Sequence, residues 1–171
     1  MNQEPFTLYK LIVLYILNQV TFPLSTAQIS DLVLEKEYTG FLTLQQAIHE
    51  LTQAGLVRAD SMLNRTLLQL TDEGRKTLSY FENRISHAIR NEIRDYLKEH
   101  KLEMRNESSI RGNYYKTTNG EFEVSLEAVD KDVTLVAIRL SVPTEELAVS
   151  ACGNWQKRNQ EIYRYLTSEL F

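Results

Sequence analysis

Cysteine is almost absent from this sequence, since Cys152 is the only one among 171 residues. A single thiol excludes a disulfide within the chain and a cysteine metal cluster. This usage is typical of proteins in a reducing compartment, so we expect a cytoplasmic location. Cys152 lies in a predicted helix that carries no nearby base, which favours a half-buried apolar role over that of a nucleophile.

Long apolar runs are absent as well. The strongest run, residues 11–17, lies between Lys10 and Asn18, and it is much shorter than the ~20 apolar residues that cross a bilayer. The beginning of the sequence has no basic region followed by a cleavage site. We therefore expect neither a membrane partner nor a signal peptide.

Basic residues do not outnumber acidic ones. The chain has 19 Lys and Arg against 23 Asp and Glu, a net charge of −4. This balance argues against nonspecific coating of nucleic acid, because affinity for DNA comes largely from neutralising phosphates. It leaves room for a local basic patch. The length allows one full domain or two small ones.

Enzyme motifs are missing too. The sequence contains no phosphate-binding glycine loop, no Gly-x-Ser-x-Gly and no His-Glu-x-x-His. His49, His87 and His100 lack metal-ligand spacing with one another or with Cys152. Glu145 and Glu146 are explained by the favourable position of acids at the start of a helix. We expect no enzymatic activity, no metal and no cofactor.

The most informative stretch that is present covers residues 41–70. A capping box of Thr43 and Gln46 predicts a helix start, and Gly55 is suited to a left-handed helix end. Two short strands, 56–58 and 66–70, should then enclose a polar tip at 60–65. The helix should bury a stripe at helical spacing, made of Leu44, Ala47, Ile48 and Leu51.

Two further helices precede this stretch. Residues 6–20 are apolar on nearly every side, which predicts a helix buried on more than one face and broken at Phe22-Pro23. A capping box of Ser25 and Gln28 begins a second helix that should run to about Glu37. Its inward residues should be Ile29, Leu32 and Val33, and residues 38–40 should form the turn of a helix-turn-helix.

These elements carry a resemblance. The helix ending in Ala-Gly-Leu-Val at 54–57, the tip with Asn64 and Arg65, and Leu-Thr-Asp-Glu-Gly-Arg at 70–75 resemble the winged-helix domains of bacterial regulators of the phenolic-acid-response (PadR) and multiple-antibiotic-resistance (MarR) types. Residues 6–15 and Phe-Glu-Asn-Arg-Ile at 81–85 resemble more closely an uncharacterised winged-helix family of Gram-positive bacteria, a domain of unknown function, over nearly the whole chain. The resemblance implies a winged helix over residues 6–80, and a function only by analogy.

Thr71 should cap a fourth helix that continues to about Lys101. An apolar stripe at steps of three and four favours packing of this helix against a partner, and we expect it to act as a connector and dimer element. The stripe consists of Leu78, Phe81, Ile85, Ile89, Ile93, Tyr96 and Leu97.

The remainder is predicted to be a small antiparallel sheet covered by one helix. Residues 102–111 are weakly extended, 121–128 and 134–142 read as strands, and a helix should run from Thr144 to about Glu169. Burial of both strands' apolar faces places Leu126 over Val136 and Val124 over Ile138, through a three-residue loop at 130–132. It also sets Glu123 opposite Arg139. The inward residues of the last helix should be Leu147, Ala151, Trp155, Ile162 and Leu166.

The candidate functional surface is the outer face of the helix in the 41–70 stretch together with the hairpin tip. Glutamine can bind adenine bidentately, and arginine is attracted to a narrow minor groove. The plainer interpretations are a solvated helix face and an ordinary hairpin. Residues 1–77 hold six basic and eight acidic side chains, which is unusual for DNA binding. The candidate DNA contacts are Thr43, Gln45, Gln46, His49, Gln53, Arg58, Asn64 and Arg65.

The aromatic residues of the second half could line an effector pocket, although a small core also needs large side chains. They are Tyr114, Tyr115, Phe122, Trp155, Tyr163 and Tyr165.

The sequence as a whole predicts an α+β protein. It should comprise a winged helix at 1–77, a connecting helix at 78–101 and a sheet-plus-helix domain at 102–171. The expected function is that of a cytoplasmic, homodimeric transcription regulator that binds double-stranded DNA, with a small-molecule effector as a further candidate partner. The alternative is a module for protein interaction or assembly.

Overall fold

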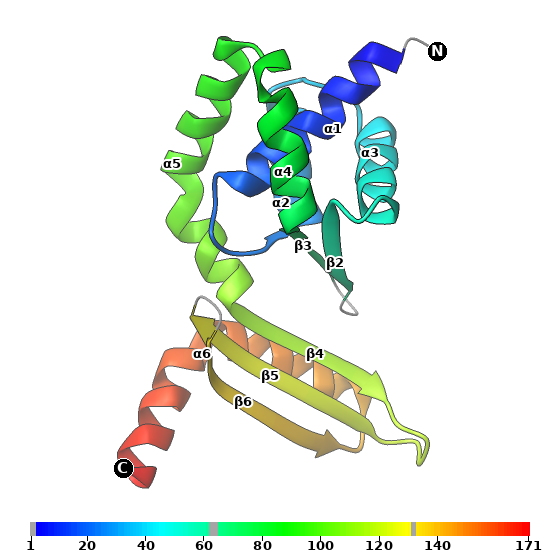
Figure 1. Ribbon diagram of the computed structural model, residues 1–171. Helices are drawn as coiled ribbons and strands as arrows, with labels where there is room; N and C mark the ends of the chain where they lie inside the picture. Colours follow the sequence, from blue (N-terminus) through cyan, green and yellow to red (C-terminus); the bar gives the residue numbers. More distant parts are fainter. Residues whose placement is uncertain (1–2, 62–64, 131–132) are drawn as a thin grey trace. The chain divides into compact units, whose positions relative to one another are not determined.

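The structure is a computed structural model that describes residues 3–61, 65–130 and 133–171. Within those ranges the chain forms six α-helices, one short 3-10 helix and two antiparallel three-stranded sheets, so the predicted mixed α+β class is confirmed. The chain divides into two compact units, which meet in sequence between Arg105 and Asn106 (Figure 1). Each unit is described by itself.

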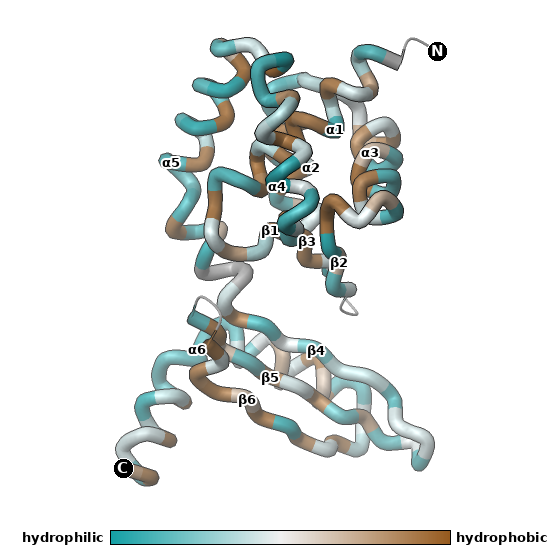
Figure 2. Tube along the Cα trace, in the orientation of Figure 1, coloured by the Kyte–Doolittle hydropathy of each residue, from teal (hydrophilic) through white to brown (hydrophobic). Residues whose placement is uncertain are grey.

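The first unit is built around α1. Its elements are α1 (Gln3–Asn18), β1 (Leu24–Ser25), α2 (Thr26–Glu35), α3 (Phe41–Gln53), β2 (Val57–Ser61), β3 (Thr66–Leu70), α4 (Asp72–Phe81), the 3-10 helix η1 (Glu82–Arg84) and α5 (His87–Ser109). Residues 11–17 of α1 are all buried, as their apolar pattern predicted, and α1 is coloured apolar along much of its length (Figure 2). Burial of each aliphatic side chain in this run contributes roughly 1.5–3 kcal/mol to the stability of the fold.

Helices α2 and α3 end in the same way. In α2, Tyr38 N–H donates to the Val33 carbonyl and Glu37 N–H donates to the Leu34 carbonyl, which is a Schellman motif. Glu37 occupies the left-handed position of that motif, with φ of 56°. The helix therefore ends at Glu35, slightly before the predicted end. The capping box of Ser25 and Gln28 at its start is confirmed.

In α3, Gly55 holds the equivalent left-handed position, with φ of 75°, as predicted. Leu56 N–H donates to the Leu51 carbonyl across the same motif. The start of α3 differs from the prediction. The cap residue is Gly40, which makes no side-chain cap. The capping box of Thr43 and Gln46 is wrong, because the helix already includes Phe41 and Thr43 lies inside its first turn.

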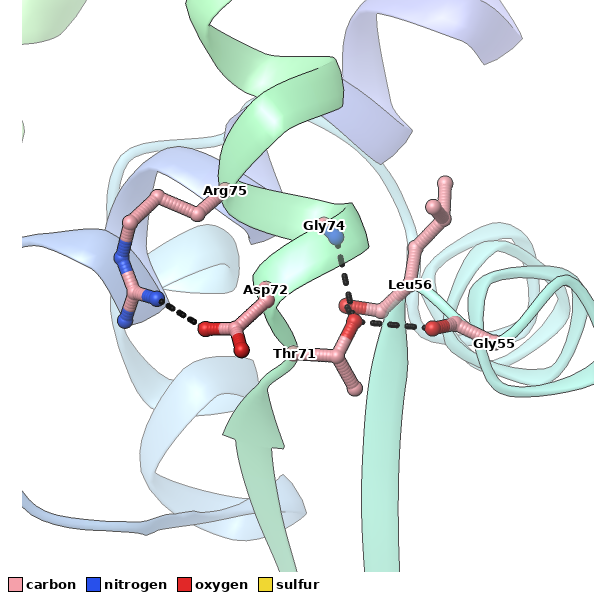
Figure 3. Close-up of polar contacts among 6 residues, drawn as sticks. All are labelled: Gly55, Leu56, Thr71, Asp72, Gly74 and Arg75. Carbon is pink, nitrogen blue, oxygen red and sulfur yellow. Dashed lines mark hydrogen bonds and ion pairs between the residues drawn. The ribbon is translucent and has the colours of Figure 1, made fainter.

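Strands β2 and β3 form a hairpin that β1 completes into a sheet of order β1-β3-β2. Val57 pairs with Leu70, and Ser61 with Thr66. Thr71 then joins this hairpin to α4 (Figure 3). Its hydroxyl accepts from Gly74 N–H at 3.0 Å and lies 2.8 Å from the Gly55 carbonyl, to which it donates. The predicted Thr71 cap is confirmed.

Gly74 is required for close packing of α4 on the hairpin, although glycine has a weak helix propensity. A Cβ added there would collide with the Leu56 carbonyl oxygen and lie 2.8 Å from Leu70 Cδ1. The first turn of α4 thus packs directly on the chain that enters β2, and only glycine allows this approach.

The helix predicted from Thr71 to Lys101 is broken in the structure. Helix α4 ends at Phe81, η1 follows, and α5 begins at His87, where Ile89 N–H donates to the Ser86 hydroxyl. The apolar stripe predicted for this single helix is divided between α4 and α5, and both helices cover the core of the first unit. Its buried members, which therefore pack on their own chain, are Leu78, Ile85, Ile93, Tyr96 and Leu97.

Residues 102–109 are helical, so the weakly extended segment predicted at 102–111 is wrong except at its end. Met104 is buried in the first unit's core, at a spacing that continues the stripe from Leu97, and its carbonyl accepts from the Gln28 side chain at 3.2 Å. Strand β4 (Ile110–Lys116) follows. The prediction missed this strand because its alternation is weak.

The second unit is a sheet of order β4-β5-β6, formed with β5 (Phe122–Asp130) and β6 (Val133–Val142). The predicted register is wrong by two residues, since Leu126 pairs with Ile138 and Val124 with Leu140. The predicted three-residue loop was needed to place the apolar faces of both strands on the same side of the sheet. A register shift between Ala128 and Val129 has the same effect, so the same apolar faces still meet. Lys131 and Asp132 of that loop lie outside the described residues.

Glu123 and Arg139 are not directly opposite, because Ser141 faces Glu123 across the strands. They still form an ion pair at 3.9 Å, along the diagonal.

Helix α6 (Glu145–Leu170) covers one face of this sheet, and its last turns extend past the strands (Figure 1). Thr144 caps it, as its position predicted. Trp155 is buried and donates from Nε1 to the Glu127 carbonyl at 3.0 Å. Leu147 was predicted to point inward but is exposed. Its neighbour Ala148 is buried instead, on the same side of the helix as Trp155 and the predicted inward residues Ala151 and Ile162, which pack against the same core.

Candidate nucleic-acid interface

The side of α3 away from the core carries most of the predicted contact residues. Gln46, His49 and Gln53 are exposed, and Thr43 and Gln45 are half-buried. The predicted inner stripe of α3 is fully buried. The helix therefore presents a row of amide and imidazole groups that can donate and accept hydrogen bonds.

Glu50 interrupts this row with a negative charge. Its carboxylate forms an ion pair with Lys10 Nζ of α1 at 3.2 Å. The other oxygen accepts from Gln46 Nε2 at 3.4 Å. The ion pair links α1 to α3 and offsets the acid that would repel phosphate. The hydrogen bond to the other oxygen holds Gln46 against the helix surface.

The hairpin places its arginines differently. On β2, Arg58 donates to the Gln69 side chain at 2.9 Å and forms an ion pair with Asp60 at 3.4 Å. Arg65 lies directly before β3 and is half-buried. Asn64 is outside the described residues, so its predicted role has no structural description.

Acids lie beside the cations of this surface. Arg58 is paired with Asp60, and Arg75 with Asp72 at 3.1 Å (Figure 3). Exposed pairs of this kind are worth ~0–1 kcal/mol, so a phosphate can replace the acid. Each exchange nevertheless leaves a carboxylate near the nucleic acid, which limits the gain from each contact.

The comparisons with known proteins give one family. The family described as "Domain of unknown function (DUF4364)" matches residues 9–170. The chain belongs to the DUF4364 family. No curated protein and no solved structure matched it.

This DUF4364 chain has two surface residues on α3 that the sequence prediction overlooked. Phe41 and Leu42 begin the helix, and Leu42 is 81% exposed. The sequence contained a signal for this exposure, because Leu42 is an apolar residue that falls outside the buried stripe of α3. An apolar side chain at this place can contact a thymine methyl group or a protein partner.

The turn before α3 is tied to α5. The Tyr38 hydroxyl donates to the Glu92 carboxylate at 2.6 Å. Burial and this hydrogen bond raise the pKa of Tyr38 well above its ordinary value. The tyrosine therefore stays neutral at physiological pH and fixes the α2–α3 turn.

The second unit of the DUF4364 chain contains the one cysteine and the six aromatic residues that were candidates for an effector pocket. Cys152 is half-buried, and burial raises the pKa of its thiol, which disfavours the reactive thiolate. It packs against Gly112, where an added Cβ would lie 3.3 Å from Cys152 Cα. Among the predicted pocket aromatics, Trp155 is a core residue, while Tyr115, Tyr163 and Tyr165 are exposed. None of the helices in the described ranges is long and apolar enough to cross a membrane.

Proposed function

We propose that this protein is a cytoplasmic transcription regulator that binds double-stranded DNA through a winged helix in its first unit. In this assignment α2 and α3 are the helix-turn-helix, α3 is the recognition helix and the β2–β3 hairpin is the wing. One observation carries the proposal. The apolar stripe of α3 is buried while its glutamine-bearing side remains exposed, which is the arrangement that major-groove docking needs.

Gln45, Gln46, His49 and Gln53 would face base edges, and Thr43 the backbone. Arg58, Asn64 and Arg65 would contact phosphates or the minor groove from the wing. The phosphates would compete with Asp60 for Arg58.

We also propose that the regulator is a homodimer, so that two recognition helices read a pseudo-palindrome. The stripe of α4 and α5 packs on the first unit itself, so the dimer contact uses another surface. Measurement of the molar mass in solution by light scattering tests this part. A mass of two chains supports it, and a mass of one chain at micromolar concentration contradicts it.

The test of DNA binding is selection from random duplex DNA with the full chain at moderate salt. Enrichment of one sequence class is the expected result. Arg65→Ala should then weaken binding to selected and unrelated duplexes alike and reduce the salt slope by about one. Arg164→Ala, an exposed arginine of α6, is the matched control and should leave both unchanged.

A second candidate function is a protein-interaction module. It is favoured by the exposed Phe41 and Leu42 on α3 and by the acids paired with the surface cations. Failure of selection to enrich any sequence, together with no measurable binding to duplex DNA at low salt, would favour it over the regulator.

A further inference from the structure

A pocket lies behind α3 in the first unit and is open to solvent on one side. It has a volume of about 200 Å³ and is lined by α1, α3, the Leu56 segment, α4 and the end of η1. Its apolar walls are Leu11, Leu14, Leu51, Leu56 and Phe81. An engineered apolar cavity of ~150 Å³ holds a benzene molecule, so this pocket can hold an apolar body of about six carbons.

The rim of the pocket has more positive than negative charge. Lys10 and Arg84 line it, with Glu50 as the acid. Glu50 is already paired with Lys10. Within the described residues Arg84 has no carboxylate partner, and its guanidinium lies 5.3 Å from the centre of the Phe81 ring. One cation at the mouth is therefore not neutralised.

Arg84 also lines a second, more open hollow along α1, of about 710 Å³. The two hollows share Thr7, Leu11 and Arg84. A ligand can thus enter along α1 and pass the guanidinium before it reaches the apolar walls. Glu4 lines the outer hollow and disfavours an anion that remains there.

We propose that this pocket binds a compact apolar carboxylate of about six carbons, with the carboxylate between Arg84 and Lys10 and the apolar body against the leucines. Charge complementarity selects an anion over a neutral molecule of the same shape. The volume suits an apolar body of this size.

The site is connected to the outer face of α3 by Glu50. A ligand carboxylate that takes Lys10 leaves Glu50 without its cation, beside Gln46. An uncompensated carboxylate there repels phosphate. On the assumption that the proposed DNA-binding function is correct, the ligand would lower DNA affinity.

The site itself is tested without DNA. Amide NMR titration of the full chain with hexanoate should shift resonances of α1 and α3 at millimolar concentration, with Kd on the order of 1 mM. Hexanamide, which lacks the charge, should bind about tenfold more weakly. Arg84→Gln should cause a similar loss for hexanoate. Lys98→Gln, the same charge change on the exposed face of α5, should not.

A variant that narrows the pocket provides a second test. Ala54 lines it at the end of α3, and Ala54→Leu should weaken hexanoate binding while the unliganded melting temperature stays close to wild type. No shifts with hexanoate, or equal affinity for hexanoate and hexanamide, would overturn the site.

Coupling is measured on the selected duplex. Saturating hexanoate should raise the Kd for DNA about fivefold, and Glu50→Gln should remove this dependence. Hexanoate binding with an unchanged Kd for DNA would overturn the coupling. Absence of DNA binding before hexanoate is added would instead overturn the proposed function and leave the site in place.

Discussion

At the scale of single residues, the two glycines that lie in helices have opposite environments. Gly74 meets the Leu56 carbonyl oxygen and Leu70, whereas nothing lies within 4 Å of a Cβ placed on Gly153. The sequence shows two helical glycines and cannot separate them. The difference arises from a chain crossing that only the folded structure contains.

Gly74→Ala should destabilise the protein by about 2–4 kcal/mol, because the methyl group pushes α4 away from the hairpin. Gly153→Ala should stabilise it by about 0.5–1 kcal/mol through helix propensity. Urea denaturation followed by circular dichroism measures both. Equal effects of the two substitutions would contradict the close packing at Gly74.

Tyr38 gives a prediction about pH. Its pKa is raised by burial and by the bond to Glu92, so the bond stabilises the protein fully below the ordinary tyrosine pKa of about 10. Above that pH the unfolded tyrosine ionises first, and the stabilisation declines. Tyr38→Phe should therefore cost about 1 kcal/mol at pH 8.

The cost of Tyr38→Phe should shrink when the same urea denaturation is repeated at pH 10.5. Both proteins retain Tyr15 and Tyr96, whose pKa values burial also raises, so their ionisation cancels in the comparison. A wild-type minus variant difference that is independent of pH would contradict this account of Tyr38.

At the scale of elements, local signals predicted helix ends better than they predicted pairing. The Ser25 box, Gly55 and Thr71 act as caps on atoms within a few residues, and all three are confirmed. The box of Thr43 and Gln46 is the local signal that failed. The break after Phe81 and the pairing of Leu126 with Ile138 depend on packing against distant segments and on a bulge. No local pattern contains that information.

The shared ending of α2 and α3 permits a matched experiment. Glu37 and Gly55 both have positive φ, which costs a side-chain-bearing residue about 1 kcal/mol. Glu37→Gly should therefore stabilise the protein by up to about 1 kcal/mol, and Gly55→Ala should destabilise it by a similar amount. Thermal unfolding of both variants measures the pair, and a loss of stability in Glu37→Gly would contradict the assignment.

At the scale of the whole molecule, the sequence revealed apolar surfaces and left their partners open. The stripe that runs into α5 was expected to meet a second subunit, yet Ile93 and Leu97 pack on the core that contains α1. A sequence pattern shows that a face must be covered and cannot show by which chain. For the same reason the exposed glutamine side of α3 was predictable, while the Lys10–Glu50 pair behind it was not.

We propose that this exposed side of α3 reads base sequence. The most direct test of this proposal is the affinity of Gln46→Ala and Gln45→Ala for the selected duplex and for a scrambled one, with Gln160→Ala on α6 as the control. We expect the α3 variants to lose about 1–3 kcal/mol of binding free energy on the selected duplex alone, and the control to lose none. Wild-type affinity of both α3 variants for the selected duplex would contradict the proposal.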